Sequence, residues 1–249
     1  MEPVVLLILF AVFLGALSQR VTGMGFALVC GPFLVLLLDP FSGVVLVNLC
    51  GILASSVVFA RTWREVEWPS FWQLALGAIL GAVPGALLAA SLPVPPLQIL
   101  IGSLIVVSII SSLIIGHIGH TLPARPAAKL TAGLLSGAMS ASAGTGGPAI
   151  SAYAVLTKWE HRAFAATLQP FLIVGAGFAV VLKLSMDDNA WPELDAGTWV
   201  AIVLVLAAGL SLGEWLSKRL PVSAARVTMI VLALGGGVAT LIKGFVHVV

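Results

Sequence analysis

The chain has 249 residues, of which 60% are hydrophobic and only 9% are charged. Soluble domains carry about 25% charged residues, so this composition excludes a protein that is surrounded by water on all sides. The net charge of +2 is too small to indicate a nucleic-acid partner. We therefore expect an all-α integral membrane protein that forms a single membrane domain over residues 1–249.

Ten apolar segments follow one another along the chain. They cover residues 3–17, 26–38, 43–60, 71–91, 97–116, 127–143, 148–157, 164–184, 197–216 and 223–246. A membrane-spanning helix needs about 20 residues, so the first, second, sixth and seventh segments are too short to cross alone. Small residues interrupt each short pair, at Thr22-Gly23-Met24-Gly25 and at Gly144-Thr145-Gly146-Gly147-Pro148. We expect a broken helix at each of these two places.

The chain also repeats itself. A shift of 122 positions aligns Gly15 with Gly137, and a shift of 128 positions aligns Gly81 with Gly209. This predicts one repeat over about 3–116 and a second over about 127–246. Each repeat consists of a broken, re-entrant helix pair followed by three transmembrane helices, and the two repeats are inverted relative to each other, as in many transporters.

The basic residues support the re-entrant arrangement. If each broken pair enters and leaves on one face, nine basic residues lie on one side of the membrane and two, Lys183 and Lys243, on the other. If each pair crosses once, the distribution is six against five. The positive-inside rule favours the first arrangement. It predicts a multi-pass protein of the cytoplasmic (inner) membrane with both termini on the outer face. The nine residues are Arg61, Arg64, Arg125, Lys129, Lys158, Arg162, Lys218, Arg219 and Arg226.

We expect the substrate-binding site at the two breaks. A break leaves backbone N–H groups without partners, which the membrane tolerates only inside protein or along a watery cavity. The half-helices that begin near Phe26 and Ala149 each present N–H donors and a positive dipole end, which suit an anion. The candidate substrate-binding residues are Arg20, Gln19, Thr22, Gly23, Gly25, Asn48, Ser142, Thr145, Gly146, Gly147 and Gln169.

Arg20 is the ionisable candidate, and the sequence shows no Asp or Glu in the interior of a predicted span to neutralise it. A bound anion is one partner that would do so. The alternative is that Arg20 reaches the membrane surface or binds free carbonyl groups at the end of the first half-helix. For Gln19, Asn48 and Gln169, the alternative to substrate contact is hydrogen bonding between helices.

Two further patterns bear on partners and activity. Gly77, Gly81 and Gly85 are spaced so that a neighbouring helix can approach closely, either within the chain or in a homodimer. No phosphate-binding loop and no catalytic motif occurs in the sequence, so we expect neither an enzyme nor a cofactor.

The second break, with Gly133, Gly137 and Gly144 to Pro148, resembles the glycine-rich motif of the TauE/SafE sulfite exporter family. The first break, from Gly15 to Phe26, resembles its partner in the other half. The resemblance implies secondary transport of sulfite, a sulfonate such as sulfoacetate, or a related sulfur anion, bound at the two breaks. Two alternatives stay open: a passive anion channel, and a membrane scaffold subunit that transports nothing.

Overall fold

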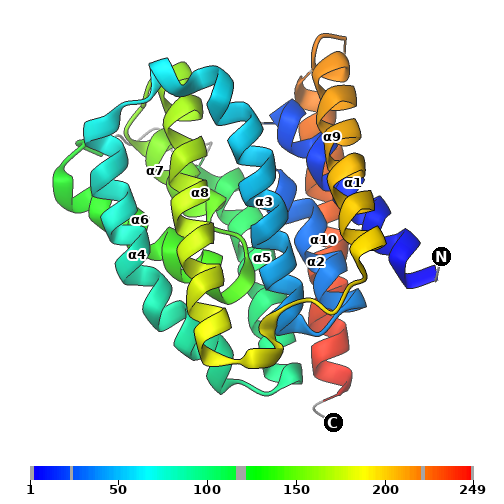
Figure 1. The fold of residues 1–249 in the computed structure, drawn as a ribbon. Coiled ribbons are helices and arrows are strands. Elements are labelled where there is room, and N and C mark those ends of the chain that lie inside the picture. Colours follow the sequence, from blue (N-terminus) through cyan, green and yellow to red (C-terminus); the bar gives the residue numbers. More distant parts are fainter. Residues whose placement is uncertain (1–2, 23–24, 116–121, 220–221, 248–249) are drawn as a thin grey trace.

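The computed structural model describes residues 3–22, 25–115, 122–219 and 222–247. Every element in these ranges is a helix, which confirms the predicted all-α class (Figure 1). The α-helices are α1 (Pro3–Thr22), α2 (Phe26–Leu37), α3 (Pro40–Thr62), α4 (Trp68–Ser91), α5 (Val94–Ile115), α6 (Pro126–Ala143), α7 (Gly147–Leu156), α8 (His161–Met186), α9 (Ala196–Ser217) and α10 (Val222–Val246). Two short 3-10 helices, Trp63–Glu65 and Asp188–Ala190, lie between them.

Seven of the helices in the described residues are long and apolar enough to cross a membrane. Their outer surfaces carry large apolar side chains, among them Leu204 and Val231, which are 65% and 63% exposed. Water-soluble proteins rarely expose apolar surface on this scale, whereas lipid covers it. The structure and the composition therefore agree on a multi-pass membrane protein.

The first helix is longer than the sequence predicts. The apolar run ends at Leu17, but α1 continues through Ser18 and Gln19 to Thr22, and its 19-residue stretch Pro3–Val21 is long enough to span. The prediction that this segment is too short to cross alone is therefore wrong. Glutamine and arginine favour helix, so a change from apolar to polar side chains does not by itself end one.

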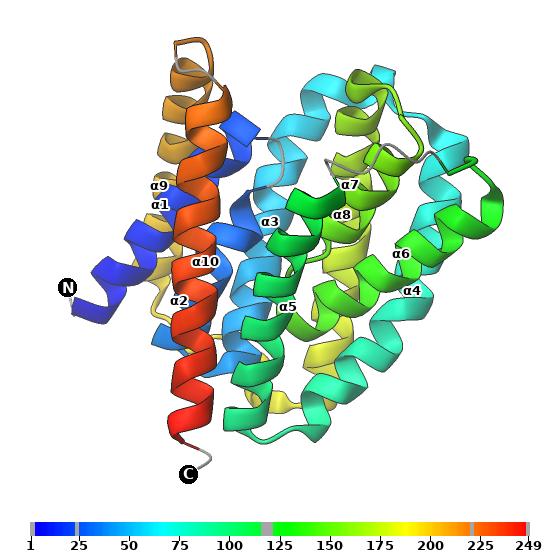
Figure 2. The same ribbon diagram turned by 180° about the vertical axis from the view of Figure 1, so that it is seen from behind.

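The two interrupted pairs run in opposite directions. In Figures 1 and 2, α1 rises and α2 descends, whereas α6 descends and α7 rises. Each pair is thus a hairpin, and the two hairpins open toward opposite ends of the bundle. Three long helices follow each hairpin, α3 to α5 and α8 to α10. This arrangement supports the division into two inverted repeats, which stays a prediction.

Glycines bring α4 and α6 into close contact. A Cβ atom placed on Gly81 would collide with the carbonyl oxygen of Leu134, and one on Gly137 would collide with that of Ala78. A second close crossing joins α1 and α9, where a Cβ on Gly209 would lie 2.8 Å from the Cβ of Ala16. The glycine run of α4 therefore serves packing inside the chain and is not free for a dimer contact.

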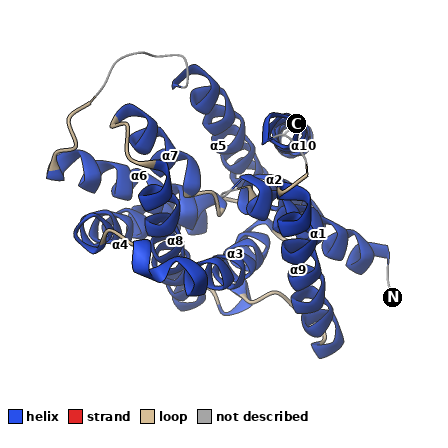
Figure 3. Ribbon diagram, turned by 90° about the horizontal axis from the view of Figure 1, so that it is seen from above, coloured by secondary structure: helices blue, strands red, loops and turns tan. Residues whose placement is uncertain are grey.

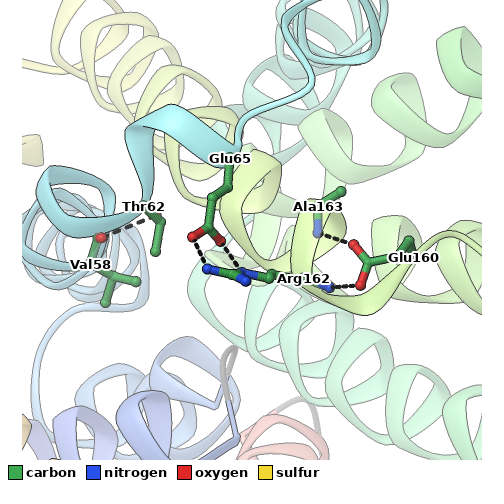
Figure 4. A network of polar contacts seen from close by, with 6 residues as sticks. All are labelled: Val58, Thr62, Glu65, Glu160, Arg162 and Ala163. Atoms are coloured by element: carbon green, nitrogen blue, oxygen red, sulfur yellow. Dashed lines mark hydrogen bonds and ion pairs between the residues drawn. The ribbon is translucent and has the colours of Figure 1, made fainter.

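Ion pairs and helix caps join several loops at one end of the bundle. Figure 4 shows Arg162, at the start of α8, whose Nε donates to Glu65 Oε2 over 2.8 Å. Beside it, Glu160 accepts the backbone N–H groups of Arg162 and Ala163 over 2.9 and 2.7 Å and so caps α8. These hydrogen bonds lower the pKa of the Glu160 carboxyl, that from Ala163 N–H most strongly.

Two further contacts belong to the same end. Arg61 Nη1 donates to Glu214 Oε2 over 2.6 Å, joining the ends of α3 and α9. Lys129 Nζ donates to Ser70 Oγ over 2.9 Å, joining the starts of α6 and α4. We call this end, where α3, α7 and α9 finish and α4, α6 and α8 begin, the basic face. The side chain of Arg226, which the sequence also assigns to it, lies outside the described residues.

We predict that Gly81→Ala destabilises the protein. Alanine gains up to about 1 kcal/mol of helix propensity, but its methyl group meets a backbone carbonyl that cannot move aside, and overpacking costs about 1–3 kcal/mol. Thermal unfolding in detergent should show a lower Tm. Gly177→Ala is the control, because a Cβ there meets nothing within 4 Å and its Tm should stay the same or rise. Equal Tm changes in the two variants would contradict the close crossing.

Candidate functional site

The first break is held by a side chain from the helix before it. Gln19 of α1 is buried, and its Oε1 accepts the backbone N–H of Phe26, the first residue of α2, over 3.2 Å. Gly25 occupies the N-cap position and has no side chain to serve this purpose. The amide of Gln19 therefore satisfies one of the donors that the break would otherwise leave unpaired in a dry environment.

The other end of α2 is also satisfied from outside the helix. Lys243 of α10 donates through Nζ to the carbonyl oxygen of Leu36 over 3.0 Å. The C-terminal end of a helix carries partial negative charge and free carbonyl groups, so a cation is a favourable partner there. With Gln19 at one end and Lys243 at the other, a helix of only 12 residues is stable inside the bundle.

The second break has a different construction. Gly144 ends α6 with φ of 71°, the left-handed conformation that glycine adopts without strain. Its N–H donates to the carbonyl of Ser140 over 2.9 Å, and Ser136 Oγ donates to the carbonyl of Gly146 over 2.6 Å. The hydrogen bonds of the described residues include no acceptor for the N–H groups of Gly147 and Ala149. These two donors, at the start of α7, remain available.

A cavity of about 40 Å³ lies between the two breaks. It is placed near the middle of the bundle, because its walls include central residues of α3 and α8. A second cavity of about 10 Å³ adjoins it and shares Ser140, Gly146, Leu172 and Ala176. The residues that line the larger cavity are Gln19, Phe26, Ala27, Val47, Asn48, Gly51, Ser55, Ser140, Gly144, Gly146, Gly147, Leu172 and Ala176.

Polar side chains in and beside this cavity are buried and only partly hydrogen-bonded. Asn48 Nδ2 donates to the carbonyl of Ser140 over 3.3 Å, which ties α3 to α6. Ser55 Oγ and Thr145 Oγ1 have no partner among the described residues, and neither has Gln169 Oε1. Burying a polar group without a partner costs free energy, and such groups are frequent at functional sites.

The structure brings together four of the predicted site residues. Gln19, Asn48, Gly146 and Gly147 line the same cavity, and Gly25 caps the helix whose first turn forms one wall. The backbone at the second break leaves no room for a side chain at Gly146. A Cβ on Gly146 would lie 2.9 Å from the Ser136 carbonyl oxygen, so the chain at the second break can follow this path only without a side chain.

Three other candidates, Ser142, Gln169 and Thr145, do not line the cavity in this conformation. Ser142 Oγ is used within α6, where it donates to the carbonyl of Ala138 over 2.7 Å. Gln169 and Thr145 are buried but do not line the cavity. Gly23 and the side chain of Thr22 lie outside the described residues. For all of these, substrate contact stays a prediction.

Arg20 has a partner that the sequence analysis did not foresee. Its Nη2 lies 3.6 Å from Glu214 Oε2 of α9, a carboxylate that lies near the end of its span and not in the interior. Glu214 lies within one turn of the end of α9. The sequence alone also places it at the end of this span. The side chain of Arg20 therefore belongs to the basic face. It does not line the cavity at the breaks.

Sequence reasoning missed Gly51, Ser55 and Ser136. Gly51 and Ser55 follow Asn48 by three and seven residues, so all three lie on one face of α3. Ser136 precedes Ser140 by four residues and shares its face of α6 in the same way. The helical spacing from Asn48, a candidate already chosen, was therefore the signal that would have found Gly51 and Ser55.

The cavity suits a small anion held without a full positive charge. None of the described residues that line it is charged, and the polar groups among them are amides, hydroxyls and the starts of two helices, beside apolar side chains such as Val47 and Leu172. Each helix start corresponds to about half a positive charge, and two of them converge here. The arrangement offers hydrogen-bond donors, and the described residues contain no cluster of His, Cys, Asp or Glu that could hold a metal ion.

The chain was compared with known proteins. The family described as "Sulfite exporter TauE/SafE" matches residues 7–240, which is nearly the whole chain. No curated protein matches the chain, and no solved structure matches it. The chain therefore belongs to the TauE/SafE sulfite exporter family of membrane transporters and is not an enzyme.

Proposed function

We propose that the protein is a secondary transporter of a small sulfur oxyanion, sulfite or a compact sulfonate such as sulfoacetate. The substrate binds in the cavity between the starts of α2 and α7. The observation that carries this proposal is the convergence of two half-helix N-termini on one buried polar cavity, in a chain whose family transports sulfur anions.

The neutral walls of the cavity fit a transport cycle. A transporter must release what it binds, and a buried arginine or lysine would hold an oxyanion through a charge-assisted pair. Helix dipoles, the N–H groups of Gly147 and Ala149, and the amides of Gln19 and Asn48 provide weaker attraction. The hydroxyl of Ser55 adds a donor that has no other partner among the described residues.

The cavity is also separate from the larger ones. The two larger cavities near the surface, of about 290 and 410 Å³, share no lining residue with it. An open channel would need a continuous path, whereas a carrier closes its site to both sides in part of its cycle. This separation favours a carrier over a passive channel. A scaffold subunit would need neither the breaks nor the cavity.

We further propose that the basic face lies in the cytoplasm and that the membrane is the inner membrane. The contacts of Arg61, Lys129 and Arg162 place these residues at one end of the bundle. α10 ends at the opposite end, where Figure 1 shows the C-terminus. The positive-inside rule then assigns the C-terminus to the outer face, and the inverted repeats assign the N-terminus to it as well.

Gly51→Val tests the cavity. A Cβ on Gly51 meets nothing within 4 Å, so valine can fill the cavity without displacing the protein around it. We expect the variant to keep the Tm of the wild type but to bind sulfite at least about tenfold more weakly, a loss of about 1.4 kcal/mol. The measurement is the thermal shift of detergent-purified protein with sulfite, sulfoacetate, sulfate or chloride, followed by sulfite flux into proteoliposomes.

Gly235→Val is the matched control. A Cβ on Gly235 also meets nothing within 4 Å, but this residue is exposed on α10, away from the cavity. It should bind and transport like the wild type. Normal sulfite binding by Gly51→Val would show that the cavity is not the substrate site. A wild type without flux of any of these anions would favour the scaffold function.

Cysteine labelling tests the orientation. Cys30 and Cys50 are buried, so they give little background. In intact cells, a membrane-impermeant maleimide should label Glu193→Cys, which lies in the loop before α9, and should not label Arg64→Cys, which lies on the basic face. The reverse pattern would contradict the proposed topology.

A further inference from the structure

Three cations surround one carboxylate on the basic face. Glu214 Oε2 lies 2.6 Å from Arg61 Nη1 and 3.6 Å from Arg20 Nη2, and Glu214 Oε1 lies 4.0 Å from Lys218 Nζ. The cluster therefore keeps two positive charges in excess. It joins three helices, because Arg20 and Arg61 lie in the last turns of α1 and α3, Glu214 lies in the last turn of α9, and Lys218 follows α9 as its C-cap.

A cavity of about 290 Å³ lies directly beside this cluster, between α3 and α9. These two helices run side by side in Figures 1 and 3. Arg20, Arg61 and Glu214 line the cavity at its charged end. The remaining lining residues are Leu53, Val57, Val58, Thr62, Val203, Leu206, Ala207, Leu210 and Ser211.

The walls of this cavity open toward lipid. Leu53 and Val57 of α3 and Val203 of α9 all line it and are 42%, 45% and 49% exposed. In a protein whose outer surface lies in the bilayer, exposed apolar side chains at this position meet acyl chains. A soluble anion has no apolar part that could bind to these side chains. A membrane lipid with an anionic headgroup has both a charged part for the cluster and an acyl chain for the apolar wall.

Two tryptophans mark the depth of the charged cluster. Trp63 follows Arg61 by two residues, and Trp215 follows Glu214 directly; they are 51% and 50% exposed. Exposed tryptophans at helix ends lie at the level of the lipid headgroups. The excess positive charge therefore lies where phosphate groups of lipids are found, and the apolar part of the cavity extends from there into the hydrocarbon.

We propose that this cavity binds an anionic glycerophospholipid, with its phosphate against Arg20 and Arg61 and an acyl chain along Leu53, Val57 and Val203. Basic pockets between transmembrane helices bind anionic headgroups by the same combination of charge and apolar surface. The site is separate from the proposed substrate cavity, with which it shares no lining residue.

The test measures the affinity of purified protein for phosphatidylglycerol in mixed micelles, from the Tm at increasing lipid fractions. Phosphatidylcholine at equal fractions is the neutral lipid, and glycerol phosphate is the soluble headgroup. Phosphatidylglycerol should raise the Tm more than phosphatidylcholine, and glycerol phosphate should have little effect. Arg61→Gln should weaken phosphatidylglycerol binding about fivefold, the effect of one lost cation near a membrane surface.

Arg64→Gln is the charge control, because Arg64 lies near Arg61 but stacks on Trp63 and does not line the cavity. It should keep the affinity of the wild type. Val57→Trp tests the apolar part without changing a charge and should also weaken binding, whereas Val200→Trp, on the exposed side of α9 outside the cavity, should not.

Equal stabilisation by the two lipids, equal losses in Arg61→Gln and Arg64→Gln, or undiminished binding by Val57→Trp would each overturn the proposal. Stabilisation by glycerol phosphate equal to that by phosphatidylglycerol would also overturn it, because a soluble anion would then suffice. The sulfite-induced thermal shift of Arg61→Gln should remain that of the wild type. The lipid site and the substrate site are thus tested independently.

Discussion

A backbone polar group in the interior of a membrane protein needs a partner, and this constraint shapes the structure around its two helix breaks. Gln19 and Lys243 supply partners to the two ends of α2 from neighbouring helices. At the second break, the left-handed Gly144 and the hydroxyl of Ser136 have the same effect. Gly147, at the start of α7, lines the cavity, so the proposed anion site includes a backbone donor that the capping leaves unsatisfied.

The positions of the breaks depend in turn on close helix crossings. Helices in a membrane gain little from hydrophobic association and instead depend on contact between their backbones. The glycines of α4 bring α6 against it, and those of α9 do the same for α1. Because α1 and α6 each lead into a break, the two crossings hold the breaks against α3 and α8. Each crossing joins a helix of the first half of the chain to a helix of the second half.

Charge is separated from the cavity along the same helix. Gln19 and Arg20 are consecutive, and consecutive residues of a helix point about 100° apart. Gln19 therefore reaches inward to the start of α2, whereas Arg20 reaches Glu214 on the basic face. None of the described residues that line the cavity is charged, whereas Arg20, Arg61 and Lys218 lie around Glu214 on the basic face.

The sequence by itself determined the membrane class, the all-α fold, the family and the places of both breaks. These features follow from composition and from small residues next to one another, which act locally. Tertiary structure alone decided that Glu214 pairs with Arg20 and that Asn48 contacts the carbonyl of Ser140. Both contacts join residues far apart in the chain, and local patterns do not specify which side chains the packing of the helices brings together. It also decided that the side chain of Gln19 turns back to cap α2 across the first break.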